Sequence, residues 1–207
     1  MVSTEVLEKT CTIAAYLDLE DAAELRHEFN NGTVEPMAGG TIPHNAVKGE
    51  IYTNFNLAIR QGKLPHVALN SDTKVRIERK NRFVYPDVTV TDEMPEYYIT
   101  PEGKTRRDII INPLLVVEVL SEETRDKDKG EKFEDYSTIP GFREYLLLEP
   151  ETVWAKLYFL HDPENNLWQI TTFTDLHDTI ALRSLPIAFQ LSDIYAVLEK
   201  LPNGSAE

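Results

Sequence analysis

A run of β-branched and aliphatic residues at 114–120 has a single polar interruption. Such a run is typical of a strand that is buried on both faces of a sheet. The interruption is Glu118, and an ionised carboxylate taken out of water without a partner costs several kcal/mol or more. We therefore expect a metal ion, a cation or a proton to lie beside Glu118.

Two further patterns stand upstream of this run. Residues 28–37 read as a β-hairpin, because Asn31-Gly32 supplies the backbone angles of a tight turn. From His44 to about Gly62, apolar residues recur at helical spacing, which predicts an amphipathic helix. His44 lies at the end of the apolar stripe of that helix and is expected to face the domain interior.

The rest of the chain alternates between strand and helix patterns. Ser121 or Thr124 can cap a helix that runs to about Ser137, and Ser192 begins a short terminal helix. The segment 94–112 is charged and rich in turn residues, and it reads as a loop or an excursion over the sheet. The predicted strands are 67–69, 74–78, 83–91, 113–120, 144–148, 153–160 and 168–173.

This mixture predicts an α/β or α+β fold, with a central mixed sheet flanked by helices and additional β-hairpins. The 207 residues, 42% of them hydrophobic, fit a single domain spanning 1–207. Residues 1–25 are expected to be an N-terminal extension and 201–207 a frayed tail.

Localisation follows from what the sequence lacks. Charged residues interrupt the first twelve positions, and no apolar run approaches about 18 residues, so we expect a cytoplasmic protein with no membrane contact. The lone Cys11 excludes an internal disulfide and a cysteine-based zinc site.

Three residues suggest a chemistry. Asp87 follows Pro86 at the start of an alternating β-rich segment, Glu118 lies in the buried strand, and Lys132 lies in the predicted helix. Two carboxylates and a lysine can hold a divalent cation and position a water against a phosphodiester. Each has a simpler explanation as well: Asp87 could cap a turn, and Lys132 could only neutralise Glu118 or Asp128.

The motifs around these residues resemble a known family. Pro86-Asp87 followed by Glu118 in Val-Val-Glu-Val-Leu-Ser resembles the PD-(D/E)xK nuclease superfamily, which has the restriction-endonuclease-like fold. Asp128, Lys132 and Tyr136 at four-residue intervals, followed by the segment 140–150, resemble the branch named the Uma-two family of endonucleases. The resemblance extends to residues 28–44 and 185–195 and so covers most of the chain.

The resemblance implies a metal-dependent endonuclease. Asp87, Glu118 and the backbone carbonyl of Val119 would bind Mg²⁺ or Mn²⁺, and hydrolysis of DNA would proceed by in-line attack of a metal-activated water. The superfamily's lysine usually lies two residues after the second acid, where this chain has Leu120. Lys132 is the natural replacement, and a nearby cation would tend to lower its pKa.

Other residues are expected at the edge of this site. Glu28 and Glu50 are candidates for an additional metal ligand, His44 is either a site residue or a hydrogen-bonded core residue, and Tyr136 either lines the site or packs on the sheet. Asp128 shares a helix face with Lys132 and Tyr136.

The charge of the chain opposes a nuclease function. A net charge of −14 disfavours non-specific DNA binding, which cationic surface drives. A local basic group could still guide DNA, or could be solvated surface: Lys74, Arg76, Arg79, Lys80 and Arg82. The alternative function is a non-catalytic binding or regulatory module that keeps the fold and acts through self-association or protein contacts. We expect a homodimer in either case.

Overall fold

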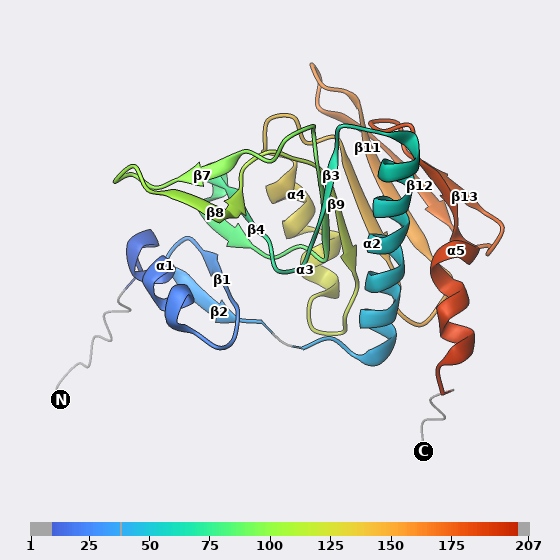
Figure 1. Ribbon diagram of the computed structural model, residues 1–207, viewed down its shortest axis with the longest axis horizontal. Helices are drawn as coiled ribbons and strands as arrows, with labels where there is room; N and C mark the ends of the chain where they lie inside the picture. The colour runs from blue at the N-terminus through green and yellow to red at the C-terminus, as the bar shows by residue number, and fades with distance from the viewer. Residues whose placement is uncertain (1–9, 38, 203–207) are drawn as a thin grey trace, which may run out of the picture.

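The computed structural model describes residues 10–37 and 39–202 and is built on a central mixed sheet (Figure 1). The sheet has the strand order β12-β11-β10-β9-β6-β3. The neighbours β9 and β10 are parallel, and the other pairs are antiparallel. Its strands are β3 (Val67–Asn70), β6 (Val88–Thr91), β9 (Pro113–Val119), β10 (Glu144–Leu148), β11 (Ala155–Asp162) and β12 (Leu167–Phe173).

A second sheet contains six strands in the order β2-β1-β5-β4-β8-β7. Its strands are β1 (His27–Asn30), β2 (Thr33–Pro36), β4 (Lys74–Ile77), β5 (Arg82–Val84), β7 (Tyr97–Ile99) and β8 (Thr105–Ile110). A separate hairpin joins β13 (Thr179–Ala181) to β14 (Ala188–Gln190). The helices are α1 (Ile13–Ala22), α2 (Ile42–Gly62), α3 (Arg125–Lys129), α4 (Glu131–Tyr136) and α5 (Leu191–Tyr195), with 3-10 turns η1 (Glu78–Lys80) and η2 (Ala196–Lys200).

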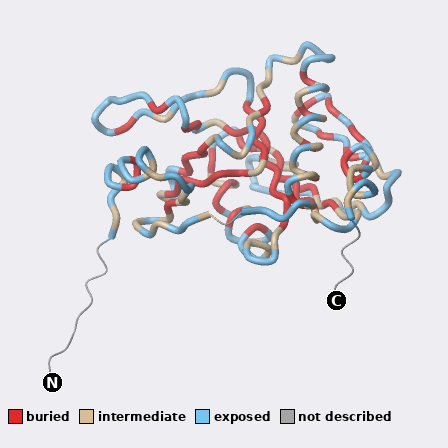
Figure 2. Tube along the Cα trace, turned by 60° about the horizontal axis from the view of Figure 1, so that its bottom comes forward, coloured by how far each residue is buried: buried red, intermediate tan, exposed pale blue. Residues whose placement is uncertain are grey.

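Helices cover both faces of the central sheet. Alternate residues of β9 belong to two different hydrophobic cores: Leu115 and Val117 pack with α2 and α5, whereas Val116 packs with Tyr136 of α4. Figure 1 shows α2 and the α3–α4 pair on either side of β9. The buried residues concentrate in the central strands, while exposed residues lie mainly on loops and outer helix surfaces (Figure 2). The predicted fold class is confirmed.

Several predicted elements have the expected limits. The hairpin turns at Asn31 and Gly32, which have φ angles of 46° and 102°. The helix α2 begins after Thr41, whose hydroxyl accepts a hydrogen bond from the amide of His44. All seven residues of β9 are buried, as its apolar pattern predicts. The described helices are all too short or too polar to cross a bilayer.

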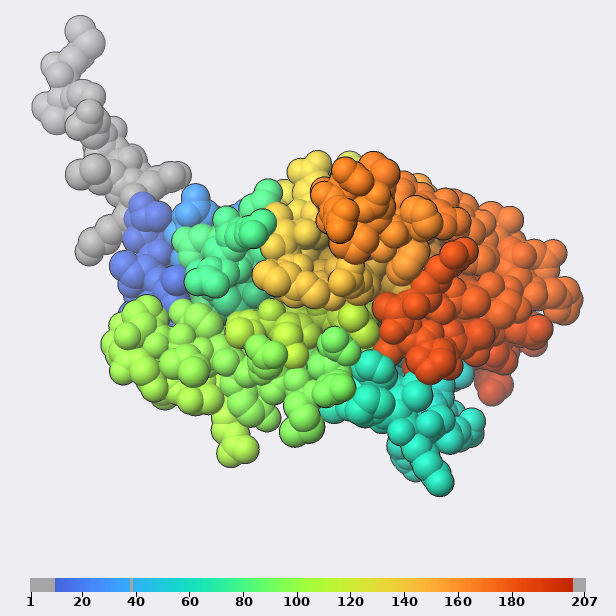
Figure 3. Space-filling model, turned by 90° about the horizontal axis from the view of Figure 1, so that it is seen from above, coloured from blue at the N-terminus to red at the C-terminus, as the bar shows by residue number. Residues whose placement is uncertain are grey.

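The prediction of a loop at 94–112 is wrong, because this segment forms the β7–β8 hairpin. Its charged residues obscured the strand pattern. Arg106 is buried through ion pairs with Asp21 of α1 and Asp108 of its own strand. In Figure 3 the yellow-green residues of this hairpin lie beside the blue residues of α1.

Two other predicted elements are divided in the structure. The strand expected at 83–91 is broken at 85–87, so that β5 and β6 belong to different sheets. Pro86 lies at the break and has no N–H to donate to a strand partner. The helix expected to run to Ser137 is two short helices that meet at Gly130, whose φ and ψ of −127° and −88° are not helical. The β13–β14 hairpin was not predicted. Residues 1–9 of the expected N-terminal extension at 1–25 and residues 203–207 of the expected tail at 201–207 lie outside the described residues.

Candidate active site

The pairing of β6 with β9 places Asp87 next to Glu118. Val88 lies opposite Val117 in this antiparallel pair, so one step further along the register brings residue 87 opposite residue 118. Two hydrogen bonds join the strands there: the amide of Val119 donates to Asp87 Oδ2 at 2.8 Å, and the amide of Asp87 donates to Glu118 Oε2 at 3.4 Å. The structure therefore brings the two predicted acids together.

Glu118 points towards α4. Strand alternation places it on the same face of β9 as Val116, which packs in the core beside α4. Tyr136 donates a hydrogen bond to Glu118 Oε1 at 3.0 Å, and Lys132 Nζ lies 3.4 Å from the same oxygen. Burial raises the pKa of Glu118 from 4.5 to about 8, although Lys132 opposes the shift. Glu118 therefore has the partner that its position in a buried strand required.

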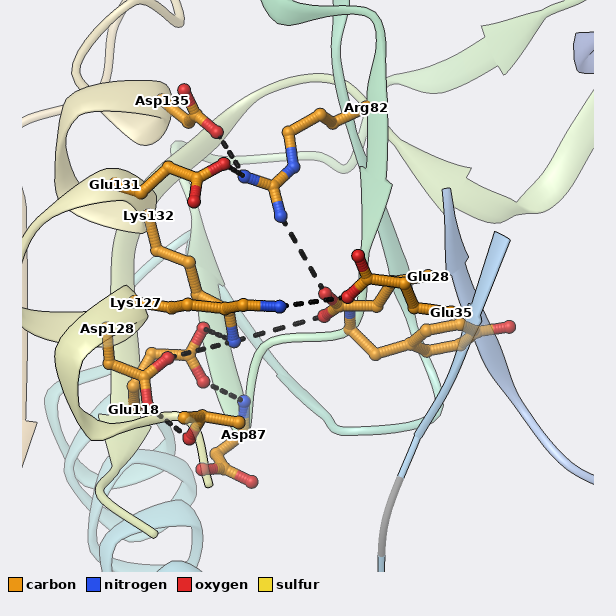
Figure 4. A network of polar contacts seen from close by, with 12 residues as sticks. Glu28, Glu35, Arg82, Asp87, Glu118, Lys127, Asp128, Glu131, Lys132 and Asp135 are labelled. Carbon is orange, nitrogen blue, oxygen red and sulfur yellow. Dashed lines mark hydrogen bonds and ion pairs between the residues drawn. The ribbon is translucent and has the colours of Figure 1, made fainter. Parts of the chain in front are cut away.

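Lys132 lies among three carboxylates (Figure 4). Its ammonium is 3.0 Å from Asp128 Oδ1, 3.4 Å from Glu118 and 3.9 Å from Glu28 Oε1, and the residue is buried. Burial alone would lower the pKa of Lys132, but the charges of Glu118, Glu28 and Asp128 raise it well above its ordinary value. This direction is opposite to the shift expected from a nearby cation, and it makes Lys132 a fixed positive charge.

His44 contacts the other side of the acid pair. Its Nε2 lies 2.9 Å from the carbonyl oxygen of Val119 and 3.4 Å from Asp87 Oδ2. Nε2 must carry a hydrogen to bond a carbonyl, so it acts as the donor. Burial raises the pKa of Asp87, but the hydrogen bond and charge of His44 together lower it below its ordinary value. Asp87 is therefore the ionised member of the acid pair, while Glu118 tends to hold a proton.

The sequence interpretation missed Lys48, whose Nζ lies 3.6 Å from Asp87 Oδ1. It follows His44 by four residues on α2, and residues four apart share a helix face. That spacing could have identified Lys48 as soon as His44 was considered a site residue.

These side chains line a cleft of about 910 Å³. The loop before α2, the end of β9 and the start of α3 form its walls. Its basic lining residues include Arg26, Lys48 and Lys127, but acidic residues outnumber the basic ones. Lys127 forms an ion pair with Glu35 of β2 at 2.9 Å and so joins α3 to the β1–β2 hairpin (Figure 4).

The donor set fits a hard divalent cation. Asp87, Glu118 and the carbonyl of Val119 supply oxygen atoms, which Mg²⁺ and Mn²⁺ prefer, and Mg²⁺ usually keeps several waters. Among the described residues, no three His, Cys, Asp or Glu side chains are arranged as a metal site. A cation here would therefore depend on two carboxylates, a carbonyl that His44 already contacts, and water.

Glu28 and Glu50, the two candidates for an additional ligand, have different positions. Glu28 reaches the site from β1, where it accepts a hydrogen bond from the amide of Tyr85 and approaches Lys132. Glu50 is not among the described residues that line the cleft. Its place on α2 is two residues beyond Lys48, and two residues along a helix point in different directions. The expectation that Glu50 belongs to the site is therefore not supported.

The expected DNA-binding group of five basic residues is not a common surface. Lys74, Arg76 and Arg82 are buried, and only Arg79 and Lys80 are exposed. Lys74 pairs with Asp108 at 2.9 Å, while the Arg76 guanidinium lies 4.5 Å from the centre of the Phe83 ring. All residues of β4 and β5 are buried, so these charges are internal: Lys74 and Arg82 pair with carboxylates, whereas Arg76 bonds the carbonyl of Arg82 and the side chain of Asn81.

Comparison with known proteins gives the family. A family model named Uma2 and described as "Putative restriction endonuclease" matches residues 13–193. The chain belongs to the Uma2 family. An uncharacterized protein of Synechocystis is 31% identical over 180 residues, which cover 87% of this chain and 88% of that protein. A second uncharacterized Synechocystis protein is 33% identical over 141 residues, 68% of this chain and 76% of that protein.

A solved structure has a similar fold. The crystal structure of a "putative nuclease belonging to DUF820" from Anabaena variabilis aligns with a TM-score of 0.66, covering 85% of this chain and 93% of that one. The sequence identity of the two is 15%, so this comparison concerns the fold. Fold and family together confirm the resemblance to restriction-endonuclease-like proteins of the Uma2 family.

Proposed function

We propose that this Uma2 protein is a Mg²⁺- or Mn²⁺-dependent endonuclease that hydrolyses DNA phosphodiester bonds. The observation that carries the proposal is the pairing of Asp87 and Glu118 at the wall of a large cleft. The amide of Asp87 donates to the Glu118 carboxylate, and the amide of Val119 donates to the Asp87 carboxylate. Burying two acids and a lysine together costs desolvation free energy. Shifted pKa values of this kind concentrate at functional sites.

A divalent cation at this site would withdraw charge from the scissile phosphate and lower the pKa of an attacking water. The protein's own residues would have separate tasks. Asp87, which His44 and Lys48 keep ionised, and Glu118 would hold the cation. Lys132 would stabilise negative charge that develops on the phosphate, because its raised pKa keeps it an ammonium. Tyr136 would hold Glu118 by its hydrogen bond.

The acidic balance of the cleft supports the same requirement for a cation. Phosphate oxygens would be repelled by a cleft whose acidic lining residues outnumber its lysines and arginines even when Glu118 is protonated. A bound divalent cation reduces this excess of negative charge and so couples DNA binding to metal binding. The non-catalytic alternative predicts no such coupling.

The test is a metal-dependent cleavage assay on the purified full chain. Supercoiled plasmid and single-stranded DNA are incubated with Mg²⁺, Mn²⁺, Ca²⁺ or EDTA, and the Asp87→Asn variant, purified in parallel, controls for a contaminating nuclease. Cleavage by the natural chain with Mg²⁺ or Mn²⁺, absent in Asp87→Asn, is the expected result. Equal cleavage by both, or no Mn²⁺ binding by calorimetry, would favour the non-catalytic module.

A further inference from the structure

The six-residue helix α4 presents two pairs of side chains in two directions. Lys132 and Tyr136 both contact Glu118, and Glu131 and Asp135 both contact Arg82 of β5. Each pair has four-residue spacing, so its members share a face of the helix. The two pairs are offset by one residue, which corresponds to a rotation of about 100° around the helix axis. Fixing one pair therefore fixes the direction of the other.

Local structure gives α4 little support of its own. Within the described residues no side chain caps its N-terminus, and the preceding residue, Gly130, has non-helical angles. Isolated helices much longer than six residues are already marginal in water. Contacts with the rest of the protein must therefore set both the position and the rotation of α4.

Arg82 makes the polar contacts that can do so. Its Nη1 donates to Asp135 Oδ2 at 2.5 Å and to Glu131 Oε1 at 2.9 Å. Arg82 and Asp135 are both buried, so water does not screen their pairing. Lys80 adds an ion pair with Asp135 at 3.1 Å, but its side chain is far more exposed. Figure 4 shows the guanidinium between α4 and the second sheet.

Glu28 connects the two sets of contacts. Its Oε2 lies 3.9 Å from Arg82 Nη2, and its Oε1 lies 3.9 Å from Lys132 Nζ. The amide of Tyr85, the residue that follows β5, also donates to Glu28 and so holds this carboxylate in place. Both faces of α4 therefore contact side chains that belong to the second sheet: Arg82 on one face and Glu28 on the other.

We propose that Arg82 is a positioning residue: through Asp135 and Glu131 it sets the rotation of α4 and so directs Lys132 and Tyr136 at Glu118. This inference rests on the proposed nuclease function for its effect on rate, but not for its effect on geometry. It also gives the second sheet a role, because β5 holds the helix that completes the acid site.

The test compares Arg82→Gln and Arg82→Lys. Lysine keeps the charge but cannot place its donors as the guanidinium does, whose Nη1 bonds Asp135 and Glu131 while Nη2 faces Glu28. We expect both variants to lose kcat, by about 10²-fold in Arg82→Gln and less in Arg82→Lys, since misplacing a catalytic group by about 1 Å can cost that much. The affinity for Mn²⁺ should fall by no more than about tenfold, the loss that follows when Tyr136 no longer bonds Glu118. The KM for DNA should change by less than about threefold, because Asp87 and Glu118 are not on α4.

Two controls separate positioning from general destabilisation. Arg60→Gln removes an exposed guanidinium from the far end of α2 and should leave kcat unchanged. Leu157→Ala removes a buried side chain from β11 and should destabilise the fold without lowering kcat at a temperature where the protein is folded. A loss of kcat in Leu157→Ala equal to that in Arg82→Gln would overturn the positioning role.

A structural measurement keeps the inference independent of cleavage. In a crystal structure of Arg82→Lys, the Lys132 ammonium should lie outside the 3.4 Å contact that it makes with Glu118 in the natural chain. An unmoved Lys132 would overturn the proposal even if the rate falls. If the natural chain cleaves no DNA, the proposed function fails, while this distance still decides the role of Arg82.

Discussion

The amide of Asp87 donates a hydrogen bond to the side chain of Glu118, and the amide that follows Glu118 donates one to the side chain of Asp87. Each acid is thereby held by the strand of the other, so neither can move without disturbing the β6–β9 pairing. The two carboxylates nevertheless differ in charge, because His44 lowers the pKa of Asp87 while burial raises that of Glu118.

Replacing Glu118 by Gln should remove metal binding while keeping the fold. The substitution has nearly the same shape but removes the carboxylate that would give up its proton and bind the cation. We expect affinity for Mn²⁺ to fall by about 10²-fold or more, since even residues behind metal ligands are worth 10- to 100-fold. Calorimetric titration of the folded variant measures this, and unchanged affinity would remove Glu118 from the metal site.

The stability of the metal-free protein should fall as pH rises from about 5 to 8. Glu118 has a folded-state pKa of about 8 against an ordinary value of 4.5, so its protonated form favours the folded state. That contribution is complete below the ordinary value and is lost as pH rises through the folded-state value, with a size of a few kcal/mol. Thermal unfolding in EDTA across this range measures it.

Other groups also titrate in this range and need a separate control. The pKa of His44 is raised as well, because Asp87 outweighs the effect of burial, so His44 contributes a loss of the same sign. Asp87 titrates below this range because its pKa is lowered, and Lys132 stays charged throughout the range because its pKa is raised. The slope should therefore flatten in Glu118→Gln and persist in part in His44→Gln. A pH dependence that is unchanged in Glu118→Gln would contradict the assignment.

Lys132→Ala should separate catalysis from metal binding. Removal of the ammonium should lower the rate of DNA hydrolysis by about 10²-fold or more, the usual scale for a positioned acid-base or electrostatic group. Mn²⁺ affinity should stay within about tenfold, because the two proposed carboxylate ligands remain. Lys129→Ala, in the preceding helix, is the matched control and should cleave normally. Equal rates in the two variants would exclude Lys132 from the mechanism.

The sequence predicted the acids better than their surroundings. Glu118 could be identified because a carboxylate is conspicuous in an aliphatic strand. Asp87 was noticed because it follows a proline, although the strand was expected to continue through that proline. The helix that carries Lys132 was predicted as one continuous element, although Gly130 divides it. The prediction that Lys132 and Tyr136 share a helix face still holds, because both residues lie within α4.

The basic group was misread for a physical reason. A sequence shows charge but not burial, and Arg82 and Lys74 read as surface residues because charged side chains are seldom buried without partners. Their partners are remote in the chain: Asp135 is 53 residues from Arg82, and Asp108 is 34 residues from Lys74. The same long-range ion pairing hid the β8 strand, whose Arg106 is buried by Asp21.

Tyr136→Phe should have a modest effect on metal binding. It removes only the hydroxyl that donates to Glu118 Oε1 at 3.0 Å, and the ring remains in its core. We expect a loss of up to about tenfold in Mn²⁺ affinity, and about 1–2 kcal/mol in the free energy of unfolding. Tyr145→Phe is the control, because its hydroxyl donates to the backbone of Asp128 and not to Glu118. Similar metal affinities in the two variants would deny Tyr136 this role.

Exposed cations at the cleft should guide DNA more than those outside it. Arg26 and Lys127 line the cleft, whereas Arg79 and Lys80 do not appear among its described lining residues. Changing Arg26 and Lys127 together to Gln should reduce the salt dependence of DNA affinity by about two units of log-log slope. Changing Arg79 and Lys80 to Gln removes the same charge and should reduce the slope less. The reverse order would place DNA along η1.

The antiparallel register of β6 and β9 also limits how the length of this chain can change. Side chains alternate between the faces of a strand, so one inserted residue within β9 before Glu118 would turn the carboxylate towards α2 and leave an aliphatic side chain facing Lys132. An insertion in the turn at 101–104, which joins β7 to β8, would shift neither strand. Single-residue insertions and deletions should therefore be tolerated in that turn and abolish metal binding in β9.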